Sequence, residues 1–572
     1  MSDTNPTKPN KSLIGNLLFQ LEEMERDGQL EFWHSGNNAF VTFKVGNHRE
    51  NWPVDSQTFR LRLTEITFNT TGRTLSDTAS KELISTLKAK ARFSGPEYPA
   101  NYRVGKHKGC IFIDLGDDSW TSIEVNSEGW RIVKKSPIRF WRTEHSRGLP
   151  IPDKGSGIEI FLKYLNVSSQ NDLLLILSFM AQALLPPGPY PVLSISGEQG
   201  SAKSTAARFI VSLVDPKAAP LRPMPGNERD LMIDASQSML LAFDNISNVK
   251  TDMSDALCRL SSGGGFSTRK LYKNSDLMVF EAQRPVVLTG INETARRGDL
   301  VDRSVSIKLN RIVPEERLSE SALNESLISD MPKIFGCLLD IVSGCLKEKD
   351  NIRLVDPPRM IDFAIIGESV AKFLGMDRGT FLNAFNGSQT DANQDIVDGS
   401  SIGEPLRVFI GDRKSWTGKA GELLSLLKNT QEEEITRRKG WPKDAARLSR
   451  ELRRLSPSLR LEGVNVEFDT PSRRLITITR ITETTDTTVT STRERSGDDC
   501  ANQSADVGTT VNVADNIFRR SVFQKQVDAF DSVVSKKRYS PEPCNSCGGR
   551  KFWETDDQVI LCGTCHPNPN RL

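Results

Sequence analysis

Net charge, long hydrophobic runs and paired cysteines are all scarce in this sequence of 572 residues. The 75 basic residues nearly cancel the 73 acidic ones, so a polyanionic partner has to be inferred from local clusters of charge. The longest apolar run, residues 173–185, has 13 residues and stops at Pro186, which is too short to cross a bilayer. We therefore expect this run to form a buried helix.

The first residues, MSDTNPTKPNK, lack the apolar core of a signal peptide. Most of the nine cysteines lack the spacing of disulfide pairs, and the scattered ones are Cys110, Cys258, Cys337, Cys345 and Cys500. Both features favour a cytoplasmic location. The length allows about four domains, each with a core of its own.

What the sequence does contain is a short apolar strand, PVLSIS, that runs into the glycine-rich loop GEQGSAKST. Gly197 and Gly200 allow backbone N–H groups to surround a polyphosphate, Lys203 would reach its β- and γ-phosphates, and Ser204 would hold Mg²⁺. The pattern G-x-x-x-x-G-K-[ST] asks for glycine where this chain has Ala202, at a cost of about 1 kcal/mol if φ must be positive. The whole loop is predicted to bind ATP: Gly197, Glu198, Gln199, Gly200, Ser201, Ala202, Lys203, Ser204 and Thr205.

Two later strands end in polar residues that suit the same chemistry. SMLLAFDN places Asp244 41 residues after Lys203, where its carboxylate would share Mg²⁺ with Ser204, and RPVVLTGIN ends in Asn292, which would sense the γ-phosphate. Eleven residues after Asn292, Arg303 would neutralise transition-state charge at a neighbouring subunit's nucleotide. Each feature alone is common in ordinary proteins, but their order predicts a P-loop ATPase core over residues 151–312.

This core resembles the ATPase of superfamily 3 helicases, particularly the primase-helicases and replication ATPases of poxviruses, phages and integrated mobile elements. The resemblance implies an AAA+-like fold, a hexamer-like ring and a DNA-touching hairpin between the second and third strands. LSSGGGFSTRKLYKNS occupies that place, with Arg269, Lys270 and Lys273 beside two aromatic residues. Such a mixture suits a single-stranded backbone and its bases, and a solvated loop is the alternative.

One residue departs from the pattern of these motors. Asn245 stands where many of them have a second acid after the metal-binding aspartate, and its amide cannot accept a proton. We therefore expect slow hydrolysis, unless Glu198 or Asp234 activates the water instead.

Residues 1–150 are expected to form an α+β domain, with an amphipathic helix over residues 13–35 and a strand at 40–45. From residue 109, short alternating runs separated by Gly, Asp and Asn predict a small sheet. Asp114, Asp117 and Asp118 would suit the paired metal ions of a primase, but their position around a glycine favours a hairpin turn.

Two further units follow the core. Residues 313–398 carry apolar residues three and four apart, which predicts a helical bundle. Residues 399–480 read as two helices and two strands, the pattern of a winged-helix domain whose second helix enters a DNA groove. We expect Pro442 in the first turn of that helix.

The second helix of this unit carries the strongest polyanion signal of the chain, with nine basic residues against two acids between Arg437 and Arg460. Four of them share one helix face and are predicted to contact DNA phosphates: Lys443, Arg447, Arg450 and Arg454. Leu448, Leu452 and Leu455 lie on another face. A solvated helix with its leucines turned inward is the alternative.

The carboxyl-terminal part has two different compositions. Residues 481–540 are rich in Thr, Ser and Asp and read as a disordered linker. Residues 541–572 contain the pairs Cys544/Cys547 and Cys562/Cys565, fourteen residues apart, which is the spacing of a zinc ribbon. Zn²⁺ would supply the folding energy that such a short segment lacks, and a redox pair is the alternative.

Together these features predict an α/β P-loop (AAA+-like) ATPase core with an α+β N-terminal domain, a helical bundle, a winged-helix domain and a zinc ribbon. The expected function is that of an ATP-dependent DNA helicase or translocase of a phage, plasmid or integrated element. Its partners would be ATP, Mg²⁺, Zn²⁺, single-stranded DNA in the ring and duplex DNA at the winged helix. The rival is a non-motor initiator, regulator or defence component switched by ATP, which Asn245 favours. Primer synthesis lacks a convincing cluster of catalytic acids.

Overall fold

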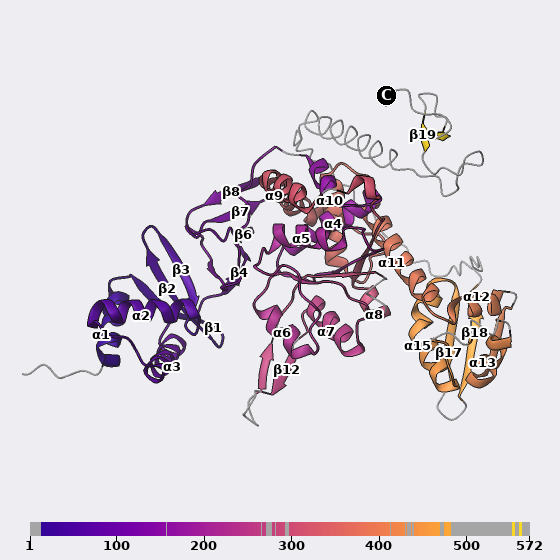
Figure 1. Cartoon of the computed structure of the whole chain (residues 1–572), viewed down its shortest axis with the longest axis horizontal. Helices are drawn as coiled ribbons and strands as arrows, with labels where there is room; N and C mark the ends of the chain where they lie inside the picture. The colour runs from indigo at the N-terminus through magenta and orange to yellow at the C-terminus, as the bar shows by residue number, and fades with distance from the viewer. Residues whose placement is uncertain are drawn as a thin grey trace, which may run out of the picture.

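In a computed structural model of the protein, an N-terminal α+β unit, a central parallel sheet, a group of long helices and a C-terminal α+β unit follow one another along the chain (Figure 1). The structure describes residues 13–155, 157–264, 266–269, 277–280, 282–291, 297–317, 319–411, 413–429, 431, 436, 440–469, 474–481, 552–554 and 560–562. Within these residues, every helix is too short or too polar to span a membrane.

The N-terminal unit is an antiparallel sheet with helices packed on one face. Its order is β1 (Leu30–Ser35), β2 (Asn38–Val45), β3 (His48–Pro53), and the helices are α1 (Leu13–Arg26), α2 (Gln57–Thr71) and α3 (Asp77–Phe93). Val41 and Phe43 of β2 share one hydrophobic core with Phe59 of α2 and Leu87 of α3. The predicted helix over residues 13–35 is wrong beyond Arg26, because Gly28 turns the chain at φ 67° and LEFWHS then alternates as a strand.

A second small sheet follows, as predicted from the alternating runs. It contains β5 (Val104–His107), β6 (Cys110–Asp114), β7 (Ser122–Asn126) and β8 (Gly129–Val133) in that order, while β4 (Ala100–Tyr102) pairs separately with β9 (Arg139–Trp141).

The three acids considered for a metal site have structural partners or a turn position instead. The guanidinium of Arg142 donates to both oxygens of Asp114, at 2.8 and 2.7 Å, and Asp117 accepts the backbone N–H of Thr121 at 2.8 Å. Asp118 lies in the same turn. Among the described residues, no cluster of three His, Cys, Asp or Glu side chains is arranged to hold a metal. The turn interpretation is confirmed.

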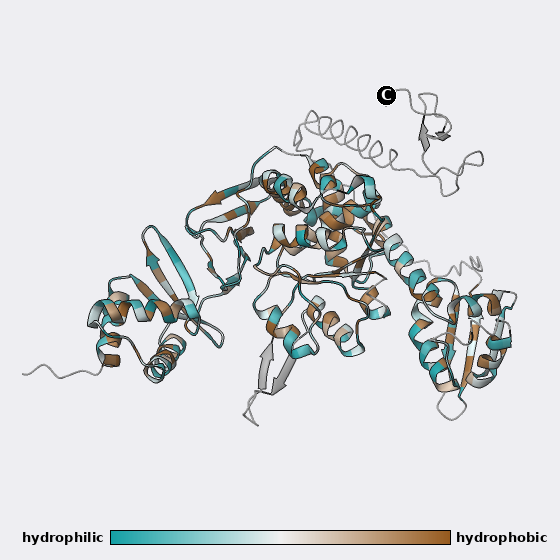
Figure 2. Cartoon of the chain, in the orientation of Figure 1, coloured by the Kyte–Doolittle hydropathy of each residue, from teal (hydrophilic) through white to brown (hydrophobic). Residues whose placement is uncertain are grey.

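The central sheet is parallel and has the order β11-β14-β10-β15. Its strands are β10 (Val192–Gly197), β11 (Leu241–Phe243), β14 (Val286–Gly290) and β15 (Ser304–Leu309). All residues of β10, β11 and β14 are buried, as expected for a parallel sheet that is covered on both faces. Figure 2 shows these strands mostly in the hydrophobic colour. Because the strands are parallel, their carboxyl ends lie along one edge.

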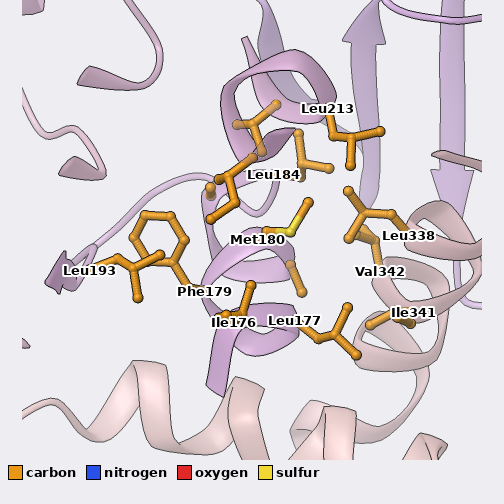
Figure 3. Close-up of a cluster of buried hydrophobic side chains, with 14 of the residues drawn as sticks. Ile176, Leu177, Phe179, Met180, Leu184, Leu193, Leu213, Leu338, Ile341 and Val342 are labelled. Atoms are coloured by element: carbon orange, nitrogen blue, oxygen red, sulfur yellow. The ribbon is translucent and has the colours of Figure 1, made fainter. Parts of the chain in front are cut away.

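The apolar run 173–185 forms most of α4 (Gln170–Ala183), and every residue of α4 from Leu173 onward is buried. Figure 3 shows side chains of α4 meeting Leu193 of β10, Leu213 of α5 (Lys203–Val214) and Leu338 of α9 (Glu320–Glu348). This confirms the prediction of a buried helix beside the central sheet.

Helices α6 (Glu228–Ser236) and α7 (Thr251–Ser262) precede the predicted hairpin. Strands β12 (Phe266–Arg269) and β13 (Leu277–Phe280) pair antiparallel and extend away from the core in Figure 1, so a hairpin is present between the second and third core strands. Lys270, Lys273 and the side chain of Arg269 lie outside the described residues.

The predicted helical bundle consists of α9, α10 (Ile361–Phe373) and α11 (Thr380–Asp398). One end of α11 belongs to the core of the bundle through Phe381 and Phe385, and its other end belongs to the core of the C-terminal unit through Ile396. The backbone of Ser306 in β15 exchanges two hydrogen bonds with Ser388 Oγ of α11, at 3.0 and 2.7 Å.

The C-terminal unit combines helices with a three-stranded antiparallel sheet. Its elements are α12 (Gly403–Gly411), β16 (Ser415–Lys419), α13 (Ala420–Asn429), α15 (Ala445–Leu461), β17 (Val464–Phe468) and β18 (Leu475–Arg480), with the sheet order β16-β18-β17. The two predicted strands are confirmed. The third, β16, was missed because SWTGK is a polar edge strand with little hydrophobic alternation.

Helix α15 begins later than predicted. Asp444 is its N-cap and accepts the backbone N–H of Arg447 at 2.8 Å, so Pro442 precedes the helix and the expectation that it lies in the first turn is wrong. An aspartate side chain that satisfies a free N–H of the first turn fixes the start of a helix more strongly than a nearby proline does.

Candidate phosphate-binding site

The loop after β10 depends on two glycines. Gly197 has φ 149° and Gly200 has φ 84°, which L side chains rarely adopt. A Cβ atom at residue 197 would lie 2.5 Å from the carbonyl oxygen of Leu309, and one at residue 200 would lie 2.9 Å from Nη2 of Arg317. A side chain at either position would therefore force the loop to change shape.

Ala202, the residue that departs from the sequence pattern, does adopt the conformation that favours glycine. It has φ 63° and ψ 27°, in the left-handed region, and it is the N-cap of α5. A left-handed residue with a Cβ atom costs about 1 kcal/mol. The chain thus adopts a left-handed conformation at the place where the pattern has the glycine before its lysine.

Lys203, the first residue of α5, folds back over the loop. Its Nζ atom donates to the carbonyl oxygens of Gly197 and Glu198, each at 2.7 Å, and to Ser201 Oγ at 3.2 Å. Burial lowers the pKa of Lys203 below its ordinary value, and the negative charge of Asp244 opposes part of that shift. The ammonium group therefore stands at the N-terminal end of α5, where the helix dipole also favours an anion.

The structure brings together Ser204 and Asp244, which are 40 residues apart in the chain. Ser204 Oγ lies 2.9 and 3.0 Å from the two carboxylate oxygens of Asp244 and donates to them. Thr289, at the end of β14, also donates its hydroxyl to Asp244. Two hydroxyls and a carboxylate at one sheet edge form an all-oxygen set, which is the kind of ligand that Mg²⁺ prefers.

Thr289 was missed by the sequence analysis. It is the single hydroxyl residue inside VVLTG, and a polar side chain near the end of a fully buried strand was the available signal. Its exposed fraction is 1%, so its hydroxyl needs a partner, and it finds that partner in Asp244.

Asn245 is exposed and left-handed, with φ 56°, and its backbone N–H donates to Thr289 Oγ1 at 3.2 Å. The two acids suggested as substitutes are placed differently. Glu198 is exposed in the loop. Asp234 of α6 accepts from Arg222 at 2.8 Å, so its carboxylate is already engaged in an ion pair.

Arg303 lies at the far end of the sheet from its own loop. Its carbonyl oxygen accepts the N–H of Val192 at 2.9 Å, at the start of β10, whereas the loop begins at Gly197, which pairs with Leu309. Five residues of strand separate these pairs, about 16 Å along the sheet. The Arg303 guanidinium donates to the carbonyl oxygen of Asp299 at 2.8 Å, so it is held at this end of the sheet.

The last predicted residue, Asn292, lies outside the described residues. The residue before it, Ile291, accepts the N–H of Gly197 through its carbonyl oxygen at 3.3 Å. The end of β14 therefore meets the phosphate loop at Ile291.

Two further residues that the sequence did not indicate support the loop. Asn166 Nδ2 donates to the carbonyl oxygens of Ser201, at 3.3 Å, and Asn310, at 2.6 Å, which ties the loop to the end of β15. Arg317 places its guanidinium beside Gly200. Both come from segments with no motif, so only the folded chain reveals them.

A cavity of about 470 Å³ lies along α5, beside the first turn. Thr205, Arg208 and Phe209 line it from α5, and Tyr164 and Leu327 line it from the other side. Its size is in the range of small-ligand pockets.

On α15, the predicted basic face is only partly free. Arg447 and Arg450 are exposed, whereas Lys443 precedes the N-cap Asp444, so its predicted place on the helix face is wrong although it is also exposed. Arg454 donates to both carboxylate oxygens of Glu451, at 3.0 and 2.6 Å. Burial alone would raise the pKa of Glu451, yet the hydrogen bonds and charge of Arg454 and a hydrogen bond from Ser400 together outweigh it and lower that pKa. The leucines on the other face are buried as predicted: Leu448, Leu452 and Leu455.

Little of the predicted zinc ribbon is described. Strands β19 (Phe552–Glu554) and β20 (Ile560–Cys562) pair antiparallel, with Phe552 opposite Cys562. The side chain of Cys562 and the residues Cys544, Cys547 and Cys565 lie outside the described residues, so the zinc site stays a prediction.

The fold and the loop define a class: an α/β protein with a phosphate-loop-like turn at the carboxyl edge of a parallel sheet. A family model described as "Actinomycete integrative conjugative element replication protein" matches residues 158–395, and a second, "AICE RepA C-terminal domain", matches residues 402–494. Together they span more than half of the chain. The chain is therefore similar to replication proteins of a mobile element.

Comparison with solved structures gives likenesses at low identity. A structure titled "SCCmec type IV Cch - active helicase" is 13% identical, with 78% of this chain and 90% of that chain covered and a TM-score of 0.39. A structure titled "The A form apo structure of NrS-1 C terminal region-CTR" is 10% identical, with 81% and 99% covered and a TM-score of 0.35. Both scores are below 0.5, so neither likeness carries weight by itself. No curated protein matches the chain.

Proposed function

We propose that this protein is an ATP-dependent DNA helicase or translocase that acts in the replication of a mobile element. In this proposal the core is an AAA+-like ATPase of the superfamily 3 type, and several copies assemble into a ring. The similarity to replication proteins of integrative conjugative elements supports the biological setting.

The observation that carries the proposal is the contact of Ser204 with Asp244, 2.9 and 3.0 Å apart, beside the loop that Lys203 covers. Bound Mg²⁺ would supply the positive charge that neutralises the phosphates and orients the γ-phosphoryl group. Ser204 and Asp244 would hold the ion, while Lys203 would exchange its bonds to loop carbonyls for bonds to phosphate oxygens. The neighbouring cavity beside Thr205 would receive the nucleoside.

The direct test is ATP turnover by the variant Lys203→Ala, with and without single-stranded DNA. We expect turnover to fall at least a hundredfold, because alanine cannot make the charge-assisted hydrogen bonds to the transferred phosphoryl group. Lys347→Ala removes an exposed lysine from the last turn of α9 and serves as the matched control, which should retain turnover. Unchanged turnover in Lys203→Ala would remove the loop from the proposal.

Asn245 favours a second candidate, a non-motor DNA-bound switch that uses ATP for assembly. Its amide cannot accept a proton, and Asp234 is already paired with Arg222. A forked DNA substrate distinguishes the two functions. Strand separation that requires ATP and is abolished in Lys203→Ala supports the motor, whereas ATP-dependent assembly on DNA without strand separation supports the switch.

DNA would be bound in two places under this proposal. The β12–β13 hairpin would contact a single strand inside the ring. Arg447 and Arg450 of α15, with Lys443 just before the helix, would contact duplex phosphates. The four cysteines of the terminal segment would bind Zn²⁺, and their role in recognition is left to experiment.

A further inference from the structure

The N-terminal unit contains a basic groove that the proposed ATPase does not use. The groove encloses about 720 Å³ and lies between the β2–β3 hairpin and the segment of residues 134–140. Five of its 16 lining residues are Lys or Arg, and none is Asp or Glu: Lys44, Arg49, Lys134, Lys135 and Arg139. His48, Asn51 and Trp120 also line it.

The register of the sheet explains why the basic residues gather on this face. Lys44 pairs directly with Arg49 across β2 and β3, and Thr42 pairs with Asn51 two residues along. Side chains alternate along a strand, so Thr42 and Lys44 face away from Val41 and Phe43, which pack on the helices. One face of the sheet is therefore the core, and the opposite face is the floor of the groove.

Like charges directly opposite each other destabilise a sheet. Within the described part of the chain, no hydrogen bond or ion pair involves the side chains of Lys44, Arg49, Lys134 or Lys135, and all four are exposed. Arg139 is different, because Glu31 accepts from it at 2.8 Å and balances its charge. A row of four uncompensated cations around one cavity indicates that an anion completes the site.

The floor and rim of the groove are held in fixed positions. Thr42 Oγ1 donates to Asn51 at 2.6 Å, and Asn51 Nδ2 donates to the carbonyl oxygen of Phe140 at 2.7 Å, which joins the sheet to the opposite wall. At the rim, Trp120 has a left-handed φ of 52°, which is rare for a bulky residue. The guanidinium of Arg142 lies 4.0 Å from its ring centre, and the ring of Trp52 meets it edge-on at 5.5 Å.

We propose that this groove binds the sugar-phosphate backbone of single-stranded DNA, with Lys44, Arg49, Lys134 and Lys135 on the phosphates and Trp120 beside a base. Cations along a groove combined with an aromatic rim are the features that bind single strands without reading their sequence. A cavity of this size admits an unpaired nucleotide but not the width of a duplex. The proposal concerns binding alone and holds whether or not the core hydrolyses ATP.

The test measures binding of a fluorescein-labelled oligothymidylate to the full chain by anisotropy over a series of salt concentrations. The variants are Lys44→Glu/Arg49→Glu and Lys134→Glu/Lys135→Glu. We expect each to bind at least tenfold more weakly, and the salt dependence to flatten by about 0.7 for each phosphate that the variant no longer neutralises. The control is Arg73→Glu/Lys81→Glu, which changes two exposed cations on the helical side of the same unit and should bind normally.

Two results would overturn the proposal. One is that both groove variants bind the oligonucleotide as tightly as the unmodified chain does, with the same salt slope. The other is that their affinity for blunt duplex DNA falls as much as their affinity for the single strand. Crosslinking is a second measurement, and it reports on the groove even when DNA also binds at other surfaces of the chain. An oligonucleotide carrying 5-iododeoxyuridine should crosslink to the peptide that contains Trp120, and crosslinks found only elsewhere would contradict the groove. Basal ATP turnover is recorded for every variant, so an absence of turnover in the unmodified chain would refute the ATPase and leave this result intact.

Discussion

At the scale of single residues, the phosphate loop is held by contacts from segments that are far apart in the chain. The pairing of Ser204 with Asp244 was predictable, because a loop hydroxyl and a strand-end acid share one sheet edge in any parallel arrangement of this type. The roles of Thr289 and Arg317 were not, since a hydroxyl in an apolar strand and an arginine in a charged stretch have many possible partners. Contacts made by distant segments become visible only in the folded chain.

The left-handed backbone of Ala202 leads to a prediction about stability. Ala202→Gly removes a Cβ atom from a conformation with φ 63°, so we expect the free energy of unfolding to rise by up to about 1 kcal/mol. Calorimetry of the unfolding transition of the core measures the change. In the same helix, Ala206→Gly should lower stability by about 1 kcal/mol or more, because that residue is helical and buried. A decrease in both variants would show that Ala202 is not strained.

A second residue-scale prediction concerns pH. The Lys217 side chain is only 10% exposed, and desolvation lowers its pKa to about 8 although Asp215 opposes the shift. The unfolded chain, with a lysine pKa of about 10.4, therefore binds more protons than the folded chain between these values, so the Lys217 contribution to stability rises with pH in that window.

The measurement is urea unfolding of the unmodified chain and of Lys217→Met at several pH values from 8 to 10. The stability difference in favour of the unmodified chain should grow by up to about 1.4 kcal/mol per pH unit. A difference that stays constant would mean that Lys217 keeps an ordinary pKa. The range stops at pH 10 because burial raises the pKa of Tyr102 to about 12, which lowers stability above that pH.

At the scale of elements, α15 illustrates how far a charge pattern can be trusted. Its leucine face was predictable from spacing alone, since a helix with a continuous apolar stripe must bury it. Its basic face was predicted as four equivalent residues, and the structure separates them, because Arg454 is held by Glu451 one turn earlier. Spacing along the helix identifies the face of each residue but not the competition between its possible partners.

The element-scale prediction is that only the exposed part of this face binds DNA. Charge reversal at Lys443, Arg447 and Arg450 should weaken duplex binding at least tenfold and reduce the salt slope by about 0.9 for each phosphate that is no longer neutralised. The control is Arg454→Gln/Glu451→Gln, which removes a charge pair that is already balanced and should leave affinity nearly unchanged. Titrations by anisotropy compare the two. Similar decreases in both variants would indicate a general effect on the fold of the unit.

At the scale of the whole molecule, the separation of Arg303 from its own loop suggests a shared site. The phosphate loop follows the carboxyl end of β10, whereas Arg303 pairs with the amino end of the same strand. A head-to-tail contact between copies would bring one end against the other, and such contacts form a ring where the rotation between copies closes. Each nucleotide would then be completed by two chains.

This arrangement predicts rescue by mixing two inactive variants. Arg303→Ala and Lys203→Ala should each have little ATP turnover alone, but a mixture of equal amounts should regain activity at roughly a quarter of the junctions, where an intact loop meets an intact Arg303. A coupled ATPase assay on the mixed proteins measures the rescue. Mixing Arg303→Ala with an Arg303→Ala/Lys203→Ala double variant is the control and should remain inactive. No gain in the first mixture would mean that Arg303 does not act between subunits.

Helix α11 is hydrogen-bonded to both the central sheet and the C-terminal unit. Near its middle, Ser388 is fastened to the backbone of β15, and further along Asn393 Oδ1 accepts from Ser458 of α15 at 2.8 Å. Because both partners are hydrogen-bonded to the same helix within two turns, a displacement of α11 would move β15 and α15 together.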